Sequence, residues 1–167
     1  KEYRRQRQMC IRDSPYVVID IGGTSIKYGL ADAKGQLLET HEMPTEAQKG
    51  GPHILNTTKE IVARYLKKHP LAGVAISSAG MVDPDKGEIF YAGPQIPNYA
   101  GTQFKKEIEE TFQIPCEIEN DVNCAGLAEV TTGHAKGSNN AVCLTIGTGI
   151  GGCLLLCLLY TSDAADD

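Results

Sequence analysis

The sequence predicts an α/β fold, in which an antiparallel meander joins parallel strands with flanking helices and is followed by the truncated start of a second, similar domain. Two observations lead to this prediction. The expected elements follow the order β-β-β-α-β-α-β, which matches neither a simple Rossmann-type alternation nor a β-sandwich. A strand–glycine turn–strand unit also occurs twice, once at Gly22 and again at Gly147. Apolar residues make up 41% of the 167 residues, enough for a hydrophobic core.

The first part of the chain is expected to form three antiparallel strands. The β-branched run Tyr16–Ile21 predicts a buried strand, Ile26–Ala31 the returning strand and Leu37–Met43 a third. Gly22–Thr24 and Ala33–Gly35 supply the two turns. The pattern therefore predicts a meander at the start of the domain.

Helices and further strands follow the meander. Apolar side chains recur at helical spacing through His53–Lys68, and Pro70 is expected to stop that helix. The remaining elements are predicted from apolar periodicity and turn residues: a strand at Leu71–Ser77, a hairpin around Val82–Tyr91, a helix at Thr102–Phe112 capped by Thr102, a strand at Cys116–Glu119, a helix at Val122–Val130, a strand at Ala141–Ile146, a glycine turn at Gly147–Gly152 and a strand from Cys153 onward.

These elements predict two domains. We expect residues 15–120 to form an N-terminal α/β domain and residues 121–156 to form the start of a truncated second domain. Residues 9–14 and 157–166 resemble translated sequencing-adapter sequence, so residues 1–14 and 157–167 are expected to be non-native extensions.

Composition narrows the class of protein. The net charge of −5 disfavours a nucleic-acid partner, which requires a basic face. None of the six cysteines forms a C-x-x-C pair and four lie in or beside apolar runs, which favours buried free thiols over a metal site or a disulfide framework. Free thiols are typical of a reducing cytoplasm. No segment reaches the roughly 18 apolar residues that a membrane span needs.

Asp20 stands at the end of the first expected strand, just before Gly22, Gly23 and Thr24. A carboxylate at the end of a buried strand is costly unless it is paired or holds a cation. Adjacent glycines let backbone N–H groups approach phosphate oxygens, and Thr24 adds a hydroxyl donor. Lys27, on the returning strand, could reach a phosphate or pair with Asp20. The alternative interpretation is an ordinary tight hairpin with an exposed aspartate.

The second glycine turn contains Gly147, Thr148 and Gly149. Together with Gly152, its glycines match the spacing of a dinucleotide-binding fingerprint, but that fingerprint opens a helix. The apolar run from Cys153 is instead typical of a strand. A glycine turn between two strands suits a hairpin that holds phosphate from the side opposite the first turn, with a purely structural hairpin as the alternative.

A third motif, Glu119–Asn123, ends a strand and opens a helix. Phosphorylation of a hydroxyl requires a carboxylate that takes the proton while the oxygen attacks the γ-phosphate. Asp121 is suited to that role, and Asn120 offers an amide to neighbouring sugar hydroxyls. The alternative is helix capping, because asparagine and aspartate are preferred N-caps.

The three motifs together resemble the ROK family of bacterial sugar kinases and repressors, which belongs to the actin-like ATPase (ribonuclease H-like) superfamily. The resemblance covers about residues 16–156 and rests on ordered motifs at Asp20–Thr24, Asn120–Asp121 and Gly147–Gly152. Two further stretches, Ile76–Asp83 and Gly93–Asn98, resemble family segments that line the sugar cleft.

The resemblance implies ATP-dependent phosphorylation of the primary (6-) hydroxyl of a hexose or hexose derivative. It implies that Asp121 is the general base and that Asp20 positions Mg²⁺ through water. Contacts to the sugar are expected from Asn120, Gly80 and Asn98. Contacts to the ATP phosphates are expected from Gly22, Gly23, Thr24, Lys27, Gly147, Thr148 and Gly149.

Family members continue beyond the second turn, where they supply further sugar contacts, often a zinc site, and the adenosine pocket. We therefore expect no zinc site in this chain, no catalysis by the fragment itself and poor solubility. The sugar stays open among glucose, mannose, N-acetylmannosamine, fructose and β-glucosides. The resemblance also implies a homodimeric full-length parent.

Other functions remain as alternatives. The same family includes sugar-responsive transcriptional repressors with an N-terminal helix-turn-helix. Residues 1–15, which precede the first strand, show no helical pattern, and this disfavours the repressor unless a truncated start hides that region. An acetate-kinase-like or chaperone-like ATPase is a weaker third alternative, because it would not need Asn120–Asp121.

Overall fold

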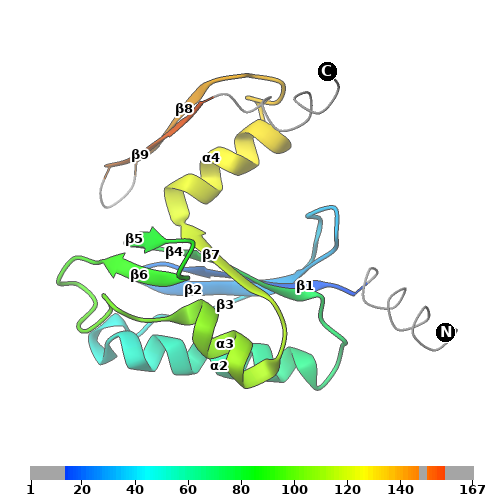
Figure 1. Ribbon diagram of the computed structural model, residues 1–167, viewed down its shortest axis with the longest axis vertical. Helices are drawn as coiled ribbons and strands as arrows, with labels where there is room; N and C mark the ends of the chain where they lie inside the picture. Colours follow the sequence, from blue (N-terminus) through cyan, green and yellow to red (C-terminus); the bar gives the residue numbers. More distant parts are fainter. Residues whose placement is uncertain (1–13, 147–149, 157–167) are drawn as a thin grey trace, which may run out of the picture. The chain divides into compact units, whose positions relative to one another are not determined.

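The computed structural model describes residues 14–146 and 150–156 of the chain (Figure 1). The chain divides into two compact units, with the division between Glu119 and Asn120. The first unit contains the meander and the first glycine turn. The second begins with Asn120 and Asp121 and includes the strands on either side of the second glycine turn.

A five-stranded mixed sheet, in the order β3-β2-β1-β4-β7, forms the centre of the first unit. Strand β2 pairs antiparallel with both β1 and β3, whereas β1 and β4 are parallel. The strands are β1 (Tyr16–Ile21), β2 (Ser25–Ala31), β3 (Leu37–Pro44), β4 (Gly73–Ser78) and β7 (Cys116–Asn120). This arrangement matches the predicted meander followed by a parallel strand.

Two helices, α2 (Gly51–Leu66) and α3 (Phe104–Phe112), lie on one face of this sheet (Figure 1). Alternation along β1 buries three apolar side chains on one face of the strand, with at most 2% exposed: Val17, Ile19 and Ile21. Asp20 therefore points to the opposite face of the sheet. None of the helices in the described ranges is long and apolar enough to cross a membrane.

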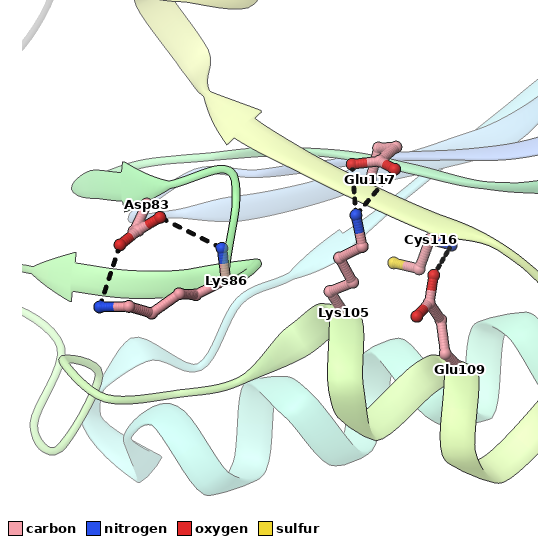
Figure 2. A network of polar contacts seen from close by, with 6 residues as sticks. All are labelled: Asp83, Lys86, Lys105, Glu109, Cys116 and Glu117. Carbon is pink, nitrogen blue, oxygen red and sulfur yellow. Dashed lines mark hydrogen bonds and ion pairs between the residues drawn. The ribbon is translucent and has the colours of Figure 1, made fainter.

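A short hairpin of β5 (Met81–Asp83) and β6 (Glu88–Tyr91) extends the first unit beyond β4. Asp83 accepts a backbone hydrogen bond from Lys86 at 3.1 Å and forms an ion pair with its ammonium at 3.2 Å, and both contacts span the hairpin turn (Figure 2). The hairpin matches the sequence prediction.

The second unit contains α4 (Asp121–Thr131) and a hairpin of β8 (Ala141–Ile146) and β9 (Ile150–Leu155). One face of the hairpin packs so closely on α4 that a Cβ added to Gly126 would meet the sulfur of Cys153. The opposite face is exposed, with apolar residues at 62–83% exposure: Val142, Leu144, Ile146, Ile150, Leu154 and Leu156.

The structure corrects three local predictions. Thr102 does not cap α3, because its hydroxyl donates to the Tyr99 carbonyl at 2.6 Å and the N-cap residue is Gln103. Helix α2 begins at Gly51, earlier than predicted, after Gly50 turns the chain with φ of +83°. Strand β9 begins at Ile150, so part of the predicted glycine turn is strand.

Candidate functional site

The first glycine turn connects β1 to β2 and is tied to the residue that follows β3. The Gly22 N–H donates to the Ser25 carbonyl at 3.0 Å. The Thr45 hydroxyl donates to the Gly22 carbonyl at 2.6 Å, and the Thr45 N–H donates to the Thr24 carbonyl at 3.0 Å. Sequence analysis did not identify Thr45, because its contacts depend on the pairing of β2 with β3.

The two glycines of this turn are not explained by backbone conformation, since neither has a positive φ. A Cβ on Gly22 would lie 3.1 Å from the Ser25 carbonyl oxygen, a tight contact. A Cβ on Gly23 would meet nothing within 4 Å, so the described fold does not require glycine there. Such a glycine is expected where a backbone must closely approach a ligand.

Gly80 provides a contrast, because its glycine has a structural explanation. Its φ of +94° lies in the left-handed region, and an added Cβ would lie 2.9 Å from the Tyr91 carbonyl oxygen. Asn98 also adopts a left-handed conformation, with φ of +53°, which asparagine tolerates better than most residues. The backbone therefore accounts for both residue types without a sugar.

Asp20 lies in a row of polar residues across the sheet. Lys27 of β2 and Ser77 of β4 are its register partners on either side. The Ser77 hydroxyl donates to Asp20 Oδ1 at 2.9 Å. Lys27 is exposed and forms no ion pair with Asp20 among the described contacts. Sequence analysis did not single out Ser77, whose role depends on the parallel pairing of β1 with β4.

No group of three His, Cys, Asp or Glu side chains within the described ranges could hold a metal ion. Mg²⁺ in nucleotide sites is usually bound through one or two carboxylates together with waters and substrate phosphates. The half-buried Asp20 carboxylate, oriented by Ser77, fits that mode of binding.

A buried hydrogen bond joins β4 to the loop that carries Asn98. The hydroxyl oxygens of Ser78 and Tyr99 lie 2.6 Å apart, and both residues are at most 1% exposed. Because the Ser78 hydroxyl donates to the Ala79 carbonyl at 3.0 Å, Tyr99 is the donor to Ser78. Burial raises the pKa of the Tyr99 hydroxyl, which keeps it protonated for this role.

Strand β7 leads directly to the Asn120–Asp121 pair, and α3 fixes its beginning (Figure 2). The Lys105 ammonium contacts both carboxylate oxygens of Glu117, at 2.8 and 2.9 Å. The Cys116 N–H donates to Glu109 Oε1 at 3.0 Å.

Asn120 is the N-cap of α4 in the second unit. Its Oδ1 accepts from the N–H groups of Val122 and Asn123 at 3.0 and 3.3 Å. Its amide donates to Asp121 Oδ1 at 2.9 Å, and that oxygen also accepts from the Val122 N–H at 2.9 Å. Asp121 is exposed, and none of the described hydrogen bonds involves its Oδ2. Capping therefore explains Asn120, whereas the described contacts assign no structural role to Oδ2 of Asp121.

The second glycine turn lies between β8 and β9. Ile146 and Ile150 are register partners at the ends of these strands. Gly147, Thr148 and Gly149 lie outside the described residues. Their predicted contacts to phosphate stay predictions.

The sequence profile of the ROK family matches residues 16–157. An uncharacterized protein of Clostridium perfringens is 52% identical over 84% of this chain and 48% of its own length. A glucokinase of Streptomyces coelicolor is 33% identical over 83% and 42%, and a β-glucoside kinase of Klebsiella pneumoniae is 38% identical over 81% and 44%. The chain thus spans less than half the length of these curated relatives.

Solved structures share the fold. A ROK family glucokinase from Streptomyces griseus in complex with glucose and AMPPNP aligns with a TM-score of 0.74 and 30% identity, over 86% of this chain and 45% of its own. A ROK family transcriptional regulator aligns with a TM-score of 0.76 over 86% and 37%, but its 19% identity shows the fold alone. These likenesses confirm the predicted fold class.

Proposed function

The chain belongs to the ROK family, and from this premise we propose that the whole protein transfers the γ-phosphoryl group of ATP to the primary (6-) hydroxyl of a hexose or hexose derivative. The sugar-kinase names of the relatives support this reaction class, and the AMPPNP complex of one relative supports ATP as the donor. The relatives are named for different sugars, so the proposal specifies a hexose class only.

The division of roles between Asn120 and Asp121 carries the proposal. Asn120 caps α4 and its amide holds Asp121 Oδ1, while Asp121 Oδ2 has no described donor. In the proposed reaction, Oδ2 takes the proton from the sugar 6-hydroxyl as that oxygen bonds to the γ-phosphorus. The bond from the γ-phosphorus to the β,γ-bridging oxygen breaks, and ADP leaves with that electron pair.

We assign the phosphate contacts to both glycine turns. The open backbone at Gly23 supports this role for Gly22, Gly23 and Thr24. Lys27, whose side chain is exposed beside Asp20, is assigned a phosphate contact. The second turn is assigned its contacts on sequence alone, through Gly147, Thr148 and Gly149. Mg²⁺ near Asp20 would neutralise charge that develops on the phosphate oxygens.

The sugar contacts are the least supported part of the proposal. The Asn120 side chain already caps α4 and donates to Asp121. We therefore assign it the orientation of the base in addition to a contact with a sugar hydroxyl. Gly80 and Asn98 each have a backbone reason for their residue type. We therefore propose that Gly80 and Asn98 fix the shape of the sugar-binding loops, and we assign the Asn98 side chain no direct hydrogen bond to the sugar.

A coupled assay of ADP release by the whole protein tests the proposal. Glucose, mannose, N-acetylmannosamine, fructose and a β-glucoside are offered in turn, with ATP and Mg²⁺. We expect at least one sugar to stimulate ADP release, with a stoichiometric 6-phosphate product identified by ³¹P NMR. If no sugar stimulates ADP release while the sugars still bind, the kinase assignment is wrong and a sugar-sensing regulator becomes the better explanation.

A further inference from the structure

Thr45 is a buried residue that contacts the first glycine turn on one side. It follows β3 directly and is 1% exposed. Its hydroxyl has a single hydrogen, which is donated to the Gly22 carbonyl at 2.6 Å. Its backbone N–H donates to the Thr24 carbonyl at 3.0 Å. One residue thus orients two of the carbonyl groups in the turn.

These contacts also orient two N–H groups. In a trans peptide the C=O and the following N–H point in opposite directions, and the described chain contains no cis peptide bond. Because the carbonyls of Gly22 and Thr24 point to Thr45, the N–H groups of Gly23 and Ser25 point away from it. A Cβ added at Gly23 would meet no atom within 4 Å, so the side of this residue where a side chain would lie is open. A backbone N–H group that points out of a turn can donate a hydrogen bond to an anion.

We propose that Thr45 is a positioning residue for phosphate binding, whose hydroxyl holds the Gly22–Gly23 peptide with the Gly23 N–H directed at a phosphate oxygen. This inference rests on the proposed function, and it adds a residue that the motif itself does not contain. A Gly22 carbonyl without this hydrogen bond could rotate toward the anion, which would replace an attractive N–H with a repulsive oxygen.

Two variants of Thr45 and one control distinguish the effect of its hydroxyl from the effect of its side-chain size. Thr45→Val keeps the shape of the side chain and the backbone N–H but removes the hydroxyl, whereas Thr45→Ser keeps the hydroxyl. Thr58→Val is a matched control in the same unit, because the Thr58 hydroxyl is also buried and donates to a carbonyl, that of Ile54 at 2.9 Å. It removes a comparable hydrogen bond away from the turn.

The ¹⁵N-labelled whole protein is titrated with Mg²⁺-ATP and, separately, with inorganic pyrophosphate, and the Gly23 amide is followed by NMR. We expect ligand to shift the Gly23 amide in the wild type, Thr45→Ser and Thr58→Val with similar affinity. Thr45→Val should bind roughly 10- to 100-fold more weakly, the loss expected for a charge-assisted hydrogen bond. Amide shifts remote from the turn should be unchanged in Thr45→Val, which separates misorientation of one peptide from general unfolding.

The outcomes distinguish the two proposals. Wild-type affinity in Thr45→Val overturns the role of Thr45 but leaves the phosphate turn in place. No shift of Gly23 in the wild type overturns both the role of Thr45 and the assignment of the first turn. If Thr45→Val does not fold, Thr45→Ser decides, because affinity at least tenfold below wild type in a variant that retains the hydroxyl contradicts the proposal.

Discussion

The same local pattern, a strand, a glycine turn and a strand, occurs in two regions of this molecule. The flanking strands are buried in the first region and largely exposed on one face in the second. The strands around the first turn contribute Val17, Ile21 and Ile26, all 0% exposed, to a core that two helices cover. The strands around the second turn contact α4 on one face and leave Ile146 and Ile150 at 83% and 80% exposure on the other. Strands with the same local pattern are therefore buried to very different extents by tertiary packing.

This difference has consequences for stability and for solution behaviour. The first turn is also held by hydrogen bonds from Thr45, which is distant in sequence. The outer face of β8–β9 is a contiguous run of exposed apolar side chains, a surface that favours association. We therefore expect the first unit to determine the resistance of the chain to unfolding and the second to determine its tendency to aggregate.

The largest expected effect is on the free energy of unfolding, and it compares one buried and one exposed position from the two regions. Ile21→Ala removes a fully buried side chain beside the first turn and should lower the free energy of unfolding by about 2–5 kcal/mol. Leu144→Ala, in β8 at 66% exposure, should change it by no more than about 0.5 kcal/mol. Urea unfolding followed by circular dichroism measures both. Equal losses would mean that the outer face of β8–β9 is as well packed as the core of the first unit.

A smaller effect is expected where α4 meets the hairpin. Gly126→Ala places a Cβ against the sulfur of Cys153 and should cost about 1–3 kcal/mol through overpacking, less the gain in helix propensity. Gly23→Ala is the control, since its Cβ enters open space at a negative φ and should leave stability unchanged or raise it slightly. Thermal unfolding compares the two, and a neutral Gly126→Ala would show that this contact is loose.

The effect that is smallest per unit step concerns pH and the buried thiol of Cys116 on β7. Burial, and then the nearby carboxylates of Glu109 and Glu117, raise the pKa of this thiol to about 12. Above the ordinary thiol pKa near 9, the unfolded chain releases its proton while the folded chain retains it, so stability should fall as pH rises from about 9 to 12. The slope should be at most about 1.4 kcal/mol per pH unit.

Urea unfolding at several pH values tests this linkage. Cys116→Ala should be less stable than the wild type at neutral pH, because it leaves a cavity, but its stability should decline less steeply above about pH 9. An unchanged slope in that variant would assign the alkaline loss to other groups, such as the buried tyrosines.

Most of the fold could be predicted from the sequence, because apolar periodicity and glycine turns report local structure. Strands β1 and β8 match their predicted bounds, and the other predicted elements differ by a few residues. One error shows the reason: Thr102 resembles a cap, but its hydroxyl is already hydrogen-bonded within the preceding loop. Local residue type alone does not show which acceptor a side chain will find.

The candidate site divides in the same way. The motif residues Asp20, Gly23 and Asp121 are recognisable because each stands in a short motif whose functional residues are neighbours in sequence. Thr45 and Ser77 act on that motif across strand pairings, so no local pattern indicated them. The structure also separates roles that the sequence left joined, because it assigns capping to Asn120 and shows no described hydrogen bond to Asp121 Oδ2.

The base role of Asp121 is the central claim, and Asp121→Asn in the whole protein tests it most directly. The variant can retain an oxygen at Oδ1, which accepts hydrogen bonds from Asn120 and Val122, so α4 should keep its N-terminus. With the best sugar from the ADP-release assay, we expect kcat to fall by at least roughly 10²-fold, with little change in the KM for ATP. Near-normal turnover by Asp121→Asn would contradict the account.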